Sequence, residues 1–201
     1  MSLPLSSGIE NCIFVKIKVN WGKPKSGEME NKKEIPTPCA WAGGVDVFEK
    51  LTDVFYGKVL KDDLLEPIFR HMSPEHSRHV AHFLVEVLKG PKLYSEEYGE
   101  HALSHMVGKH IGKHLTELQR KRWADLLLAS ADEIGMPADP EFRSTFVGHI
   151  EWGTRVAVIN SQLAENPVNQ NHHIPAWGWG EVKGPYEVVG SLFEHKPDKE
   201  Q

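Results

Sequence analysis

Apolar residues recur at three- and four-residue steps in four stretches of the chain, which is the period of an amphipathic helix. The first stripe follows Gly43-Gly44 and ends near Asp62; its members are Val45, Phe48, Leu51, Phe55 and Val59. The second begins at Ser73-Pro74-Glu75 and stops at Gly90-Pro91. A capping hydroxyl, a proline and an acid in this order predict a helix start at Ser73.

The second half of the pattern predicts two further helices. Thr116 and Gln119 form a capping box for a helix that closes at Gly135, and Asp139-Pro140-Glu141 opens a long final helix. Between the two halves, residues 92–114 contain three glycines, so any helix there should be short. Four main helices with a short irregular one between the middle pair make an all-α sandwich that can enclose a flat ligand.

Both ends of the chain lack a helical period. We expect residues 1–40 to form an arm, with a strand-like run from Cys12 to Val19, residues 41–161 to form the helical domain, and residues 162–201 to form an irregular extension. Met29 is a plausible alternative start, so residues 1–28 are interpreted as an upstream extension. In the last helix, Arg155 is expected to pair with a carboxylate, for instance in the C-terminal extension.

Composition excludes several classes of function. A net charge of -5 and a pI near 6.2 argue against binding of nucleic acid. Cys12 and Cys39 are the only cysteines, which excludes a disulfide framework and fits a reducing cytoplasm. No apolar run approaches the roughly 18 residues of a membrane-spanning helix. We therefore predict a soluble cytoplasmic protein that binds neither membrane nor nucleic acid.

Histidine is the unusual component: the chain has twelve, and nine lie between His71 and His149. His110 stands between a glycine-containing loop and Thr116, and Trp123 follows on the next helix. An iron porphyrin needs one neutral imidazole on a short, positioned segment and an apolar slot for its ring. On the opposite face, His76 lies among apolar residues, and Tyr56 lies beside the first apolar stripe.

Several short motifs, taken together, resemble the truncated haemoglobins of the second group. These are Phe55-Tyr56, Glu66-Pro67-Ile68-Phe69, Gly90-Pro91-x-x-Tyr94, His110 and Trp123, in this order and spacing over about residues 42–161. The resemblance implies a two-over-two α-helical sandwich, the truncated globin fold, with N- and C-terminal extensions. It also implies a bound haem b that takes O2, CO, NO or peroxide as small ligands.

The resemblance further implies individual roles. His110 would ligate the iron, and Tyr56, His76 and Trp123 would face the bound gas and carry any catalysis. The residues implied to contact the cofactor are Phe69, His79, Val80, Phe83, Tyr94 and Lys109, of which His79 and Lys109 would meet the propionates. Because the segment between Tyr94 and His110 is longer than is usual in this family, His105 and His114 stay as alternative ligands.

Three hydrogen-bond donors facing a bound oxygen favour chemistry over oxygen delivery, so we expect NO dioxygenase or peroxidase activity supported by a reductase. Gas sensing or storage without turnover is the alternative, in a monomer or a homodimer. A zinc hydrolase is a remote alternative, based on the i, i+4 pairs His101/His105 and His110/His114. Another is a cofactor-free interaction module that docks through the aromatic run from Trp177 to Tyr186.

Overall fold

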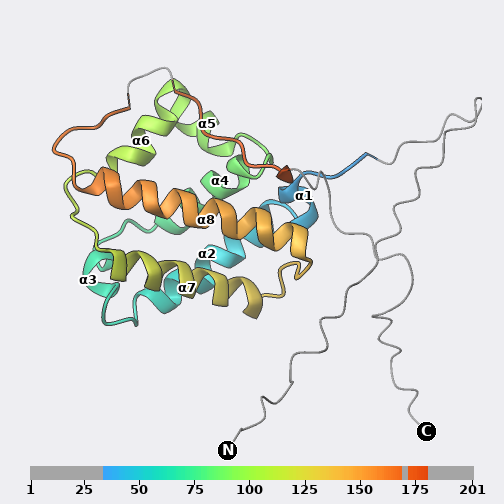
Figure 1. Ribbon diagram of the computed structural model, residues 1–201, viewed down its shortest axis with the longest axis horizontal. Helices are drawn as coiled ribbons and strands as arrows, with labels where there is room; N and C mark the ends of the chain where they lie inside the picture. Colours follow the sequence, from blue (N-terminus) through green and yellow to red (C-terminus); the bar gives the residue numbers. More distant parts are fainter. Residues whose placement is uncertain (1–33, 169–171, 181–201) are drawn as a thin grey trace, which may run out of the picture. The chain divides into compact units, whose positions relative to one another are not determined.

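The computed structural model describes residues 34–168 and 172–180, which belong to one compact unit and form helices joined by loops (Figure 1). Within these residues there is no strand, which confirms the predicted all-α class. No helix in the same ranges is long and apolar enough to cross a membrane. The strand-like run from Cys12 to Val19 and the alternative start at Met29 lie outside the described residues.

Eight α-helices and one 3-10 helix follow each other along the described chain. They are α1 (Pro38–Ala42), α2 (Val45–Val59), α3 (Glu66–Phe69), α4 (His76–Val87), α5 (Leu93–Tyr98), η1 (Gly99–His101), α6 (Ala102–Gly108), α7 (Glu117–Glu133) and α8 (Pro140–Ser161).

The four long helices form two pairs, α2 with α4 and α7 with α8, and α2 also packs on α7 (Figure 1). This is the predicted two-over-two sandwich. Its core consists of fully buried side chains from all four helices, among them Phe48, Leu51, Leu84, Leu127 and Phe146. Burial of these apolar side chains is what holds the two pairs together.

Polar contacts fix how α4 lies on α2. The Ser77 hydroxyl donates to Asp53 at 2.7 Å, and His82 Nε2 lies 3.1 Å from a carboxylate oxygen of Glu49. Both pairs sit on the edge of the helix interface. Together with the apolar packing, they hold α4 on α2 in the orientation that brings His76 beside Tyr56.

The sequence located the starts of α7 and α8 correctly. Thr116 and Gln119 form a complete capping box in which each side chain bonds the other residue's backbone N–H. At α8, the Asp139 carboxylate accepts the N–H of Phe142, and Pro140 occupies the first helical position. Both signals are local, so they act before any tertiary packing.

Other predicted boundaries were wrong. The second long helix begins at His76 and not at Ser73, because the Ser73 carbonyl accepts the N–H of His76 in a separate turn. The first ends at Val59 instead of Asp62, and the short helices α1 and α3 were not predicted. As expected, Arg155 pairs with a carboxylate, which is that of Glu151 one turn earlier in its own helix.

Residues 172–180, which we call the C-terminal strap, run without helical structure along the α4 and α8 side of the sandwich to α1 (Figure 1). The backbone N–H of Trp177 donates to the Val87 carbonyl at 2.6 Å. The indole N–H of Trp179 donates to the Pro36 carbonyl at 2.7 Å. Trp177 and Trp179 both pack against the core. The described part of the expected aromatic docking run is therefore engaged within the molecule.

Candidate functional site

His110 follows α6 and is held by one hydrogen bond that fixes its protonation. Its Nδ1 lies 3.0 Å from the carbonyl oxygen of Met106. A carbonyl can only accept, so Nδ1 carries the hydrogen and the Nε2 lone pair is free. Burial lowers the pKa of His110, which keeps the imidazole neutral near pH 7. A neutral imidazole oriented through Nδ1 in this way is the form in which histidine binds a metal.

The two alternative ligands are placed differently. His105 Nδ1 lies 2.8 Å from the Tyr94 hydroxyl, and its ring stacks on Tyr98 with centroids 3.9 Å apart. His114 is exposed and its Nδ1 lies 3.5 Å from the side chain of Gln162, the residue that follows α8. These contacts favour His110 over both alternatives as the axial ligand, which stays a prediction.

Tyr56 on α2 and His76 at the start of α4 form a hydrogen-bonded pair. The phenolic oxygen of Tyr56 lies 3.0 Å from His76 Nε2. Phe69 of α3 packs on both rings, with centroids 5.7 Å from Tyr56 and 5.9 Å from His76. The structure thus brings together three residues that lie on three separate helices.

Trp123 of α7 is connected to this group through Phe55. The rings of Trp123 and Phe55 lie edge to face with centroids 4.9 Å apart, and Phe55 also contacts Tyr56. Burial raises the pKa of the Tyr56 phenol above its ordinary value, and Trp123 offsets part of this rise. Tyr56 is therefore a neutral hydroxyl that can donate or accept a hydrogen bond. Phe69, His76, Tyr56 and Trp123 are referred to below as the distal cluster.

Burial also lowers the pKa of His76, to about 4, with smaller contributions from the charges of His79, His110 and Lys109. The ring is therefore neutral at pH 7. These contributions agree with a position of His76 on the same side of the molecule as the segment that carries His110. That the two imidazoles belong to one site stays a prediction.

The face of α4 that follows His76 is only partly covered by protein. Val80 and Phe83, one and two turns further on, are half-buried, whereas Ala81, Leu84 and Val85 on the other face are fully buried. Apolar side chains left half-exposed in a row beside two histidines are what a flat apolar ligand would cover. The donor set and this apolar face both fit a haem.

The remaining predicted contacts lie around this face. Lys109 is exposed, next to His110. His79 Nε2 lies 3.0 Å from the Glu97 carboxylate and its ring contacts Tyr98. Tyr94 is fully buried, with its ring 5.4 Å from that of Phe83. That His79, Lys109 and Tyr94 contact the cofactor stays a prediction.

The histidine pairs that motivated a zinc site do not share helical faces. His110 and His114 both follow the end of α6 at Gly108, and His101 belongs to η1 whereas His105 belongs to α6. Among the residues that the structure describes, no group of three or more histidine, cysteine or acidic side chains is arranged to hold a metal ion. The arrangement on which the zinc hypothesis rested is not formed.

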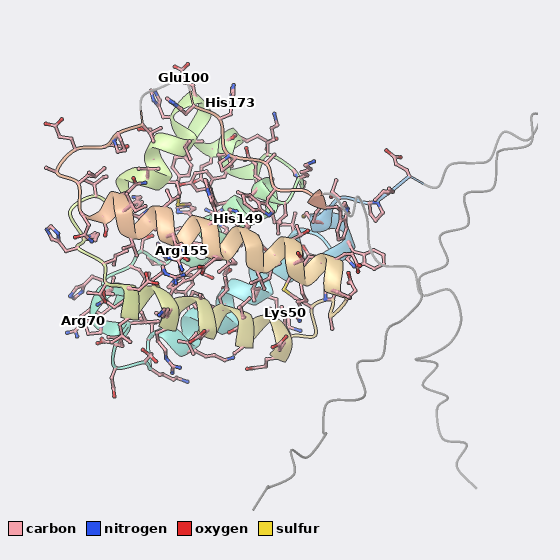
Figure 2. The ribbon with its side chains drawn as sticks, in the orientation of Figure 1. Lys50, Arg70, Glu100, His149, Arg155 and His173 are labelled. Carbon is pink, nitrogen blue, oxygen red and sulfur yellow. The ribbon has the colours of Figure 1, made fainter. Side chains whose placement is uncertain are left out.

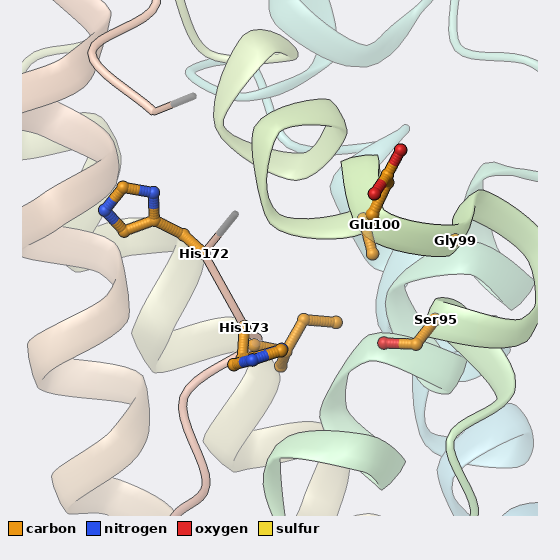
Figure 3. Close-up of a pocket in the computed structure, with 7 residues that line it drawn as sticks. Ser95, Gly99, Glu100, His172 and His173 are labelled. Carbon is orange, nitrogen blue, oxygen red and sulfur yellow. The ribbon is translucent and has the colours of Figure 1, made fainter. Parts of the chain in front are cut away.

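The sequence analysis missed two features. Tyr98, whose hydroxyl lies 3.3 Å from the ring nitrogens of His79, was not identified, although it follows Tyr94 by one helical turn on α5. A cavity of about 230 Å³ lies between α5, η1 and the C-terminal strap, lined by Ser95, Glu100, His172 and His173 among others (Figure 3). This cavity does not include the distal cluster or His110.

Comparison with known proteins gives a family match over most of the helical domain. The model of the family described as bacterial-like globin matches residues 41–158. The group 2 truncated hemoglobin YjbI of Bacillus subtilis (strain 168) is 30% identical over 123 residues, which are 61% of this chain and 89% of that protein.

Solved structures agree with this match. The group II truncated hemoglobin of Bacillus anthracis aligns with a TM-score of 0.56 at 28% identity, covering 63% of this chain and 93% of the other. The truncated oxygen-avid haemoglobin of Bacillus subtilis aligns with a TM-score of 0.54 at 28% identity, covering 61% and 99%. The N- and C-terminal extensions of this chain therefore have little counterpart in these relatives.

Proposed function

Because the chain belongs to the bacterial-like globin family, and within it to the group II truncated haemoglobins, we propose that it binds haem b through His110 and holds O2 against its distal cluster. The observation that carries this proposal is the hydrogen bond from His110 Nδ1 to the Met106 carbonyl. It leaves Nε2 as an electron-pair donor on a short segment whose direction is set by the backbone of α6.

A bound haem b supplies a ferrous iron that takes O2, CO or NO and exchanges electrons with them. The chain supplies the rest of the site. His110 would bind the iron, Phe69 would pack on the porphyrin, and Val80 and Phe83 would cover its distal side. Lys109 would meet a propionate through its ammonium, and His79 through the Nε2–H that it otherwise gives to Glu97.

The distal cluster supports tight binding of oxygen. With His76 Nε2–H donating to the Tyr56 oxygen, the phenolic O–H is free to donate to a diatomic ligand, and the Trp123 indole N–H is a second donor. If each net hydrogen bond contributes about 1 kcal/mol, two donors slow the escape of O2 by a factor on the order of 30. One of the relatives is described as oxygen-avid, which agrees with this reading.

A donor-rich pocket also supports turnover of the bound oxygen. One O2, one NO and one electron combine to give nitrate, and the part of Tyr56 and Trp123 is to hold the oxygen in a fixed orientation. With peroxide as substrate, the neutral ring of His76 beside the distal space is a candidate proton acceptor. A reductase would return the electron after each nitrate-forming turnover.

The axial ligand can be tested by absorption spectroscopy of the haem-reconstituted protein in ferric, reduced and CO-bound forms. We expect an intense Soret band that shifts with CO in the wild type, and its loss or strong alteration in His110→Gly. Added imidazole should restore the band in this variant. His105→Gly and His114→Gly serve as matched controls and should keep the wild-type spectrum. A normal spectrum in His110→Gly would move the ligand to another residue.

The distal cluster can be tested by the rate at which the oxygenated protein releases O2. Tyr56→Phe removes one donor and keeps the ring, so release should speed up about fivefold, corresponding to about 1 kcal/mol. Tyr98→Phe is the matched control because it makes the same change outside the distal cluster. Equal rates in both variants would show that Tyr56 does not contact the ligand. Nitrate yield after mixing with NO then decides whether the oxygenated protein turns over.

A further inference from the structure

Two tyrosines of α5 form a cluster with two histidines, one from α4 and one from α6. Tyr94 and Tyr98 have ring centroids 4.7 Å apart, and Tyr98 stacks on His105 at 3.9 Å. His79 of α4 lies edge-on to Tyr98 at 5.7 Å. Each phenol thus has another aromatic ring in contact and an imidazole beside its hydroxyl.

The hydrogen bonds in this cluster place an imidazole nitrogen beside each phenol. Tyr94 O–H lies 2.8 Å from His105 Nδ1. His79 Nε2 lies 3.0 Å from Glu97, and because a carboxylate only accepts, Nε2 carries the hydrogen. The Tyr98 hydroxyl lies 3.3 Å from both ring nitrogens of His79, and with the hydrogen on Nε2 it is Nδ1 that can accept from Tyr98 O–H. Burial lowers the pKa of His105, so at pH 7 its ring is neutral and able to accept.

Such an arrangement is what one-electron oxidation of tyrosine requires. A phenol that loses an electron becomes a very strong acid, so oxidation is easy only when a base already holds the hydroxyl hydrogen. Tyr94 is fully buried, so the imidazole beside its hydroxyl is the base available to it, whereas Tyr98 is half-buried and reaches the surface. The pair therefore connects the interior of the molecule to solvent.

We propose that Tyr94 and Tyr98 are a two-step electron donor, with His105 and His79 as their proton acceptors, that delivers electrons to the haem when peroxide is the oxidant. This inference rests on the proposed function. It goes beyond it by assigning the source of the electrons and the point at which a reductant would enter the molecule.

The electron balance closes with peroxide as the named oxidant. One H2O2 takes two electrons and two protons and gives two waters. Tyr94 gives an electron toward the haem and its phenolic proton to His105 Nδ1, leaving a neutral phenoxyl radical. Tyr98 refills Tyr94 with one electron while His105 returns its proton to Tyr94, and Tyr98 gives its own proton to His79. A small phenolic reductant at the surface refills Tyr98 with one electron while His79 returns its proton. Two such molecules are oxidised for each peroxide, and the two protons that they release are the two that peroxide takes up.

The location of the cluster agrees with this path. Tyr94 contacts Phe83, which would line the haem, and Tyr98 contacts His79, which would meet a propionate. His105 precedes Met106, whose carbonyl orients His110. The cluster therefore touches the predicted haem site from α4 and from the segment that holds the iron ligand.

The test is electron paramagnetic resonance of the ferric haem protein, frozen within seconds of mixing with H2O2. We expect a tyrosyl signal in the wild type that narrows when the tyrosine rings are deuterated. Tyr94→Phe should reduce this signal at least fivefold, while Tyr186→Phe, the control, leaves it unchanged. When a small phenol is added to the mixture, Tyr98→Phe should prolong the Tyr94 radical, because the route to this surface reductant is then interrupted.

The role of His105 as the proton acceptor is tested by a separate variant. His105→Gln keeps a hydrogen-bonding side chain but cannot hold the proton, so radical yield should fall and become dependent on buffer concentration. A signal that is unaffected by both Tyr94→Phe and His105→Gln would overturn the inference while leaving the proposed function intact, provided that peroxide changes the Soret band. A Soret band that peroxide does not change would overturn the inference together with the peroxide reaction.

Discussion

At the scale of single residues, His149 is a buried histidine whose protonation lowers the free energy of unfolding. It lies midway along α8 (Figure 2), is 3% exposed, and its Nδ1 has no hydrogen-bond partner among the residues that the structure describes. Its ring contacts the aromatic side chains of Phe83, Trp152 and Trp177. Burial lowers the pKa of His149 to about 4 from an ordinary value of 6.5. The neutral ring is tolerated in this position, whereas the charged ring is not.

This shift makes stability depend on pH in a defined window. Because the folded-state pKa lies below the unfolded one, the unfolded chain binds the proton more tightly, and stability falls as pH drops from 6.5 toward 4. We predict that His149→Gln reduces the loss of unfolding free energy between pH 7 and pH 5 by about 2 kcal/mol. Urea unfolding at both pH values measures this change. The exposed His101→Gln should behave as wild type; equal pH slopes in all three proteins would contradict the prediction.

The residue scale also shows what the sequence could and could not predict about the site. Spacing and resemblance assigned Tyr56, His76 and His110, and the structure places Tyr56 and His76 in contact. The protonation state of His110 was beyond the sequence because it depends on where the Met106 carbonyl points. Tyr98 was missed for a similar reason, since only folding brings α4 beside α5 and His79 beside its hydroxyl.

At the scale of elements, α7 and α8 are joined by a buried arginine. The Arg120 side chain is 4% exposed and donates to Glu117 at 2.6 Å and to Glu151 at 2.7 Å. The same guanidinium contacts the Thr154 hydroxyl at 3.2 Å, and Glu151 in turn accepts from Arg155. One planar group thus reaches partners on both helices through three separate nitrogens, a fixed spread of donors that the single nitrogen of a lysine ammonium does not reproduce.

We predict that Arg120→Lys, despite keeping the charge, lowers the melting temperature of the haem-loaded protein by about 5 °C. The physical reason is that a buried cation loses part of its hydrogen bonding and cannot regain it from water. Thermal unfolding followed by circular dichroism measures the effect. Lys121→Met, at an exposed position next to it, should leave the melting temperature within about 1 °C. A similar small shift for Arg120→Lys would show that the network contributes little.

Element boundaries were predictable where the signal was local. The Thr116 capping box and the Asp139-Pro140 start involve only residues within one turn, so the sequence contains all of the interaction. The Ser73 start failed because two local structures compete for the same residues. In the structure, the Ser73 carbonyl closes a turn in place of a helix cap by the Ser73 hydroxyl. His76 is therefore the first residue of α4, where it lies beside Tyr56.

At the scale of the whole molecule, the C-terminal strap closes over the α4 and α8 side of the sandwich. Trp177 covers His149, with centroids 5.6 Å apart, and also contacts Trp152 at 5.7 Å. Trp179 instead lies beside Trp41 of α1. The family match ends at residue 158, so this cover belongs to the extension and had no pattern in the sequence from which its path could be predicted.

The two tryptophans of the strap should therefore have separable effects. Each Trp→Ala change should lower the unfolding free energy by about 2 kcal/mol, below the value for a fully buried ring. Only Trp177→Ala exposes His149, and because burial is the cause of its lowered pKa, that pKa should rise toward 6.5. Titration of the His149 ring protons by nuclear magnetic resonance in Trp177→Ala and Trp179→Ala distinguishes the two. A pKa that stays near 4 in Trp177→Ala would mean that α4 and α8 bury His149 without the strap, and the extension would then stabilise the fold without shaping its pH dependence.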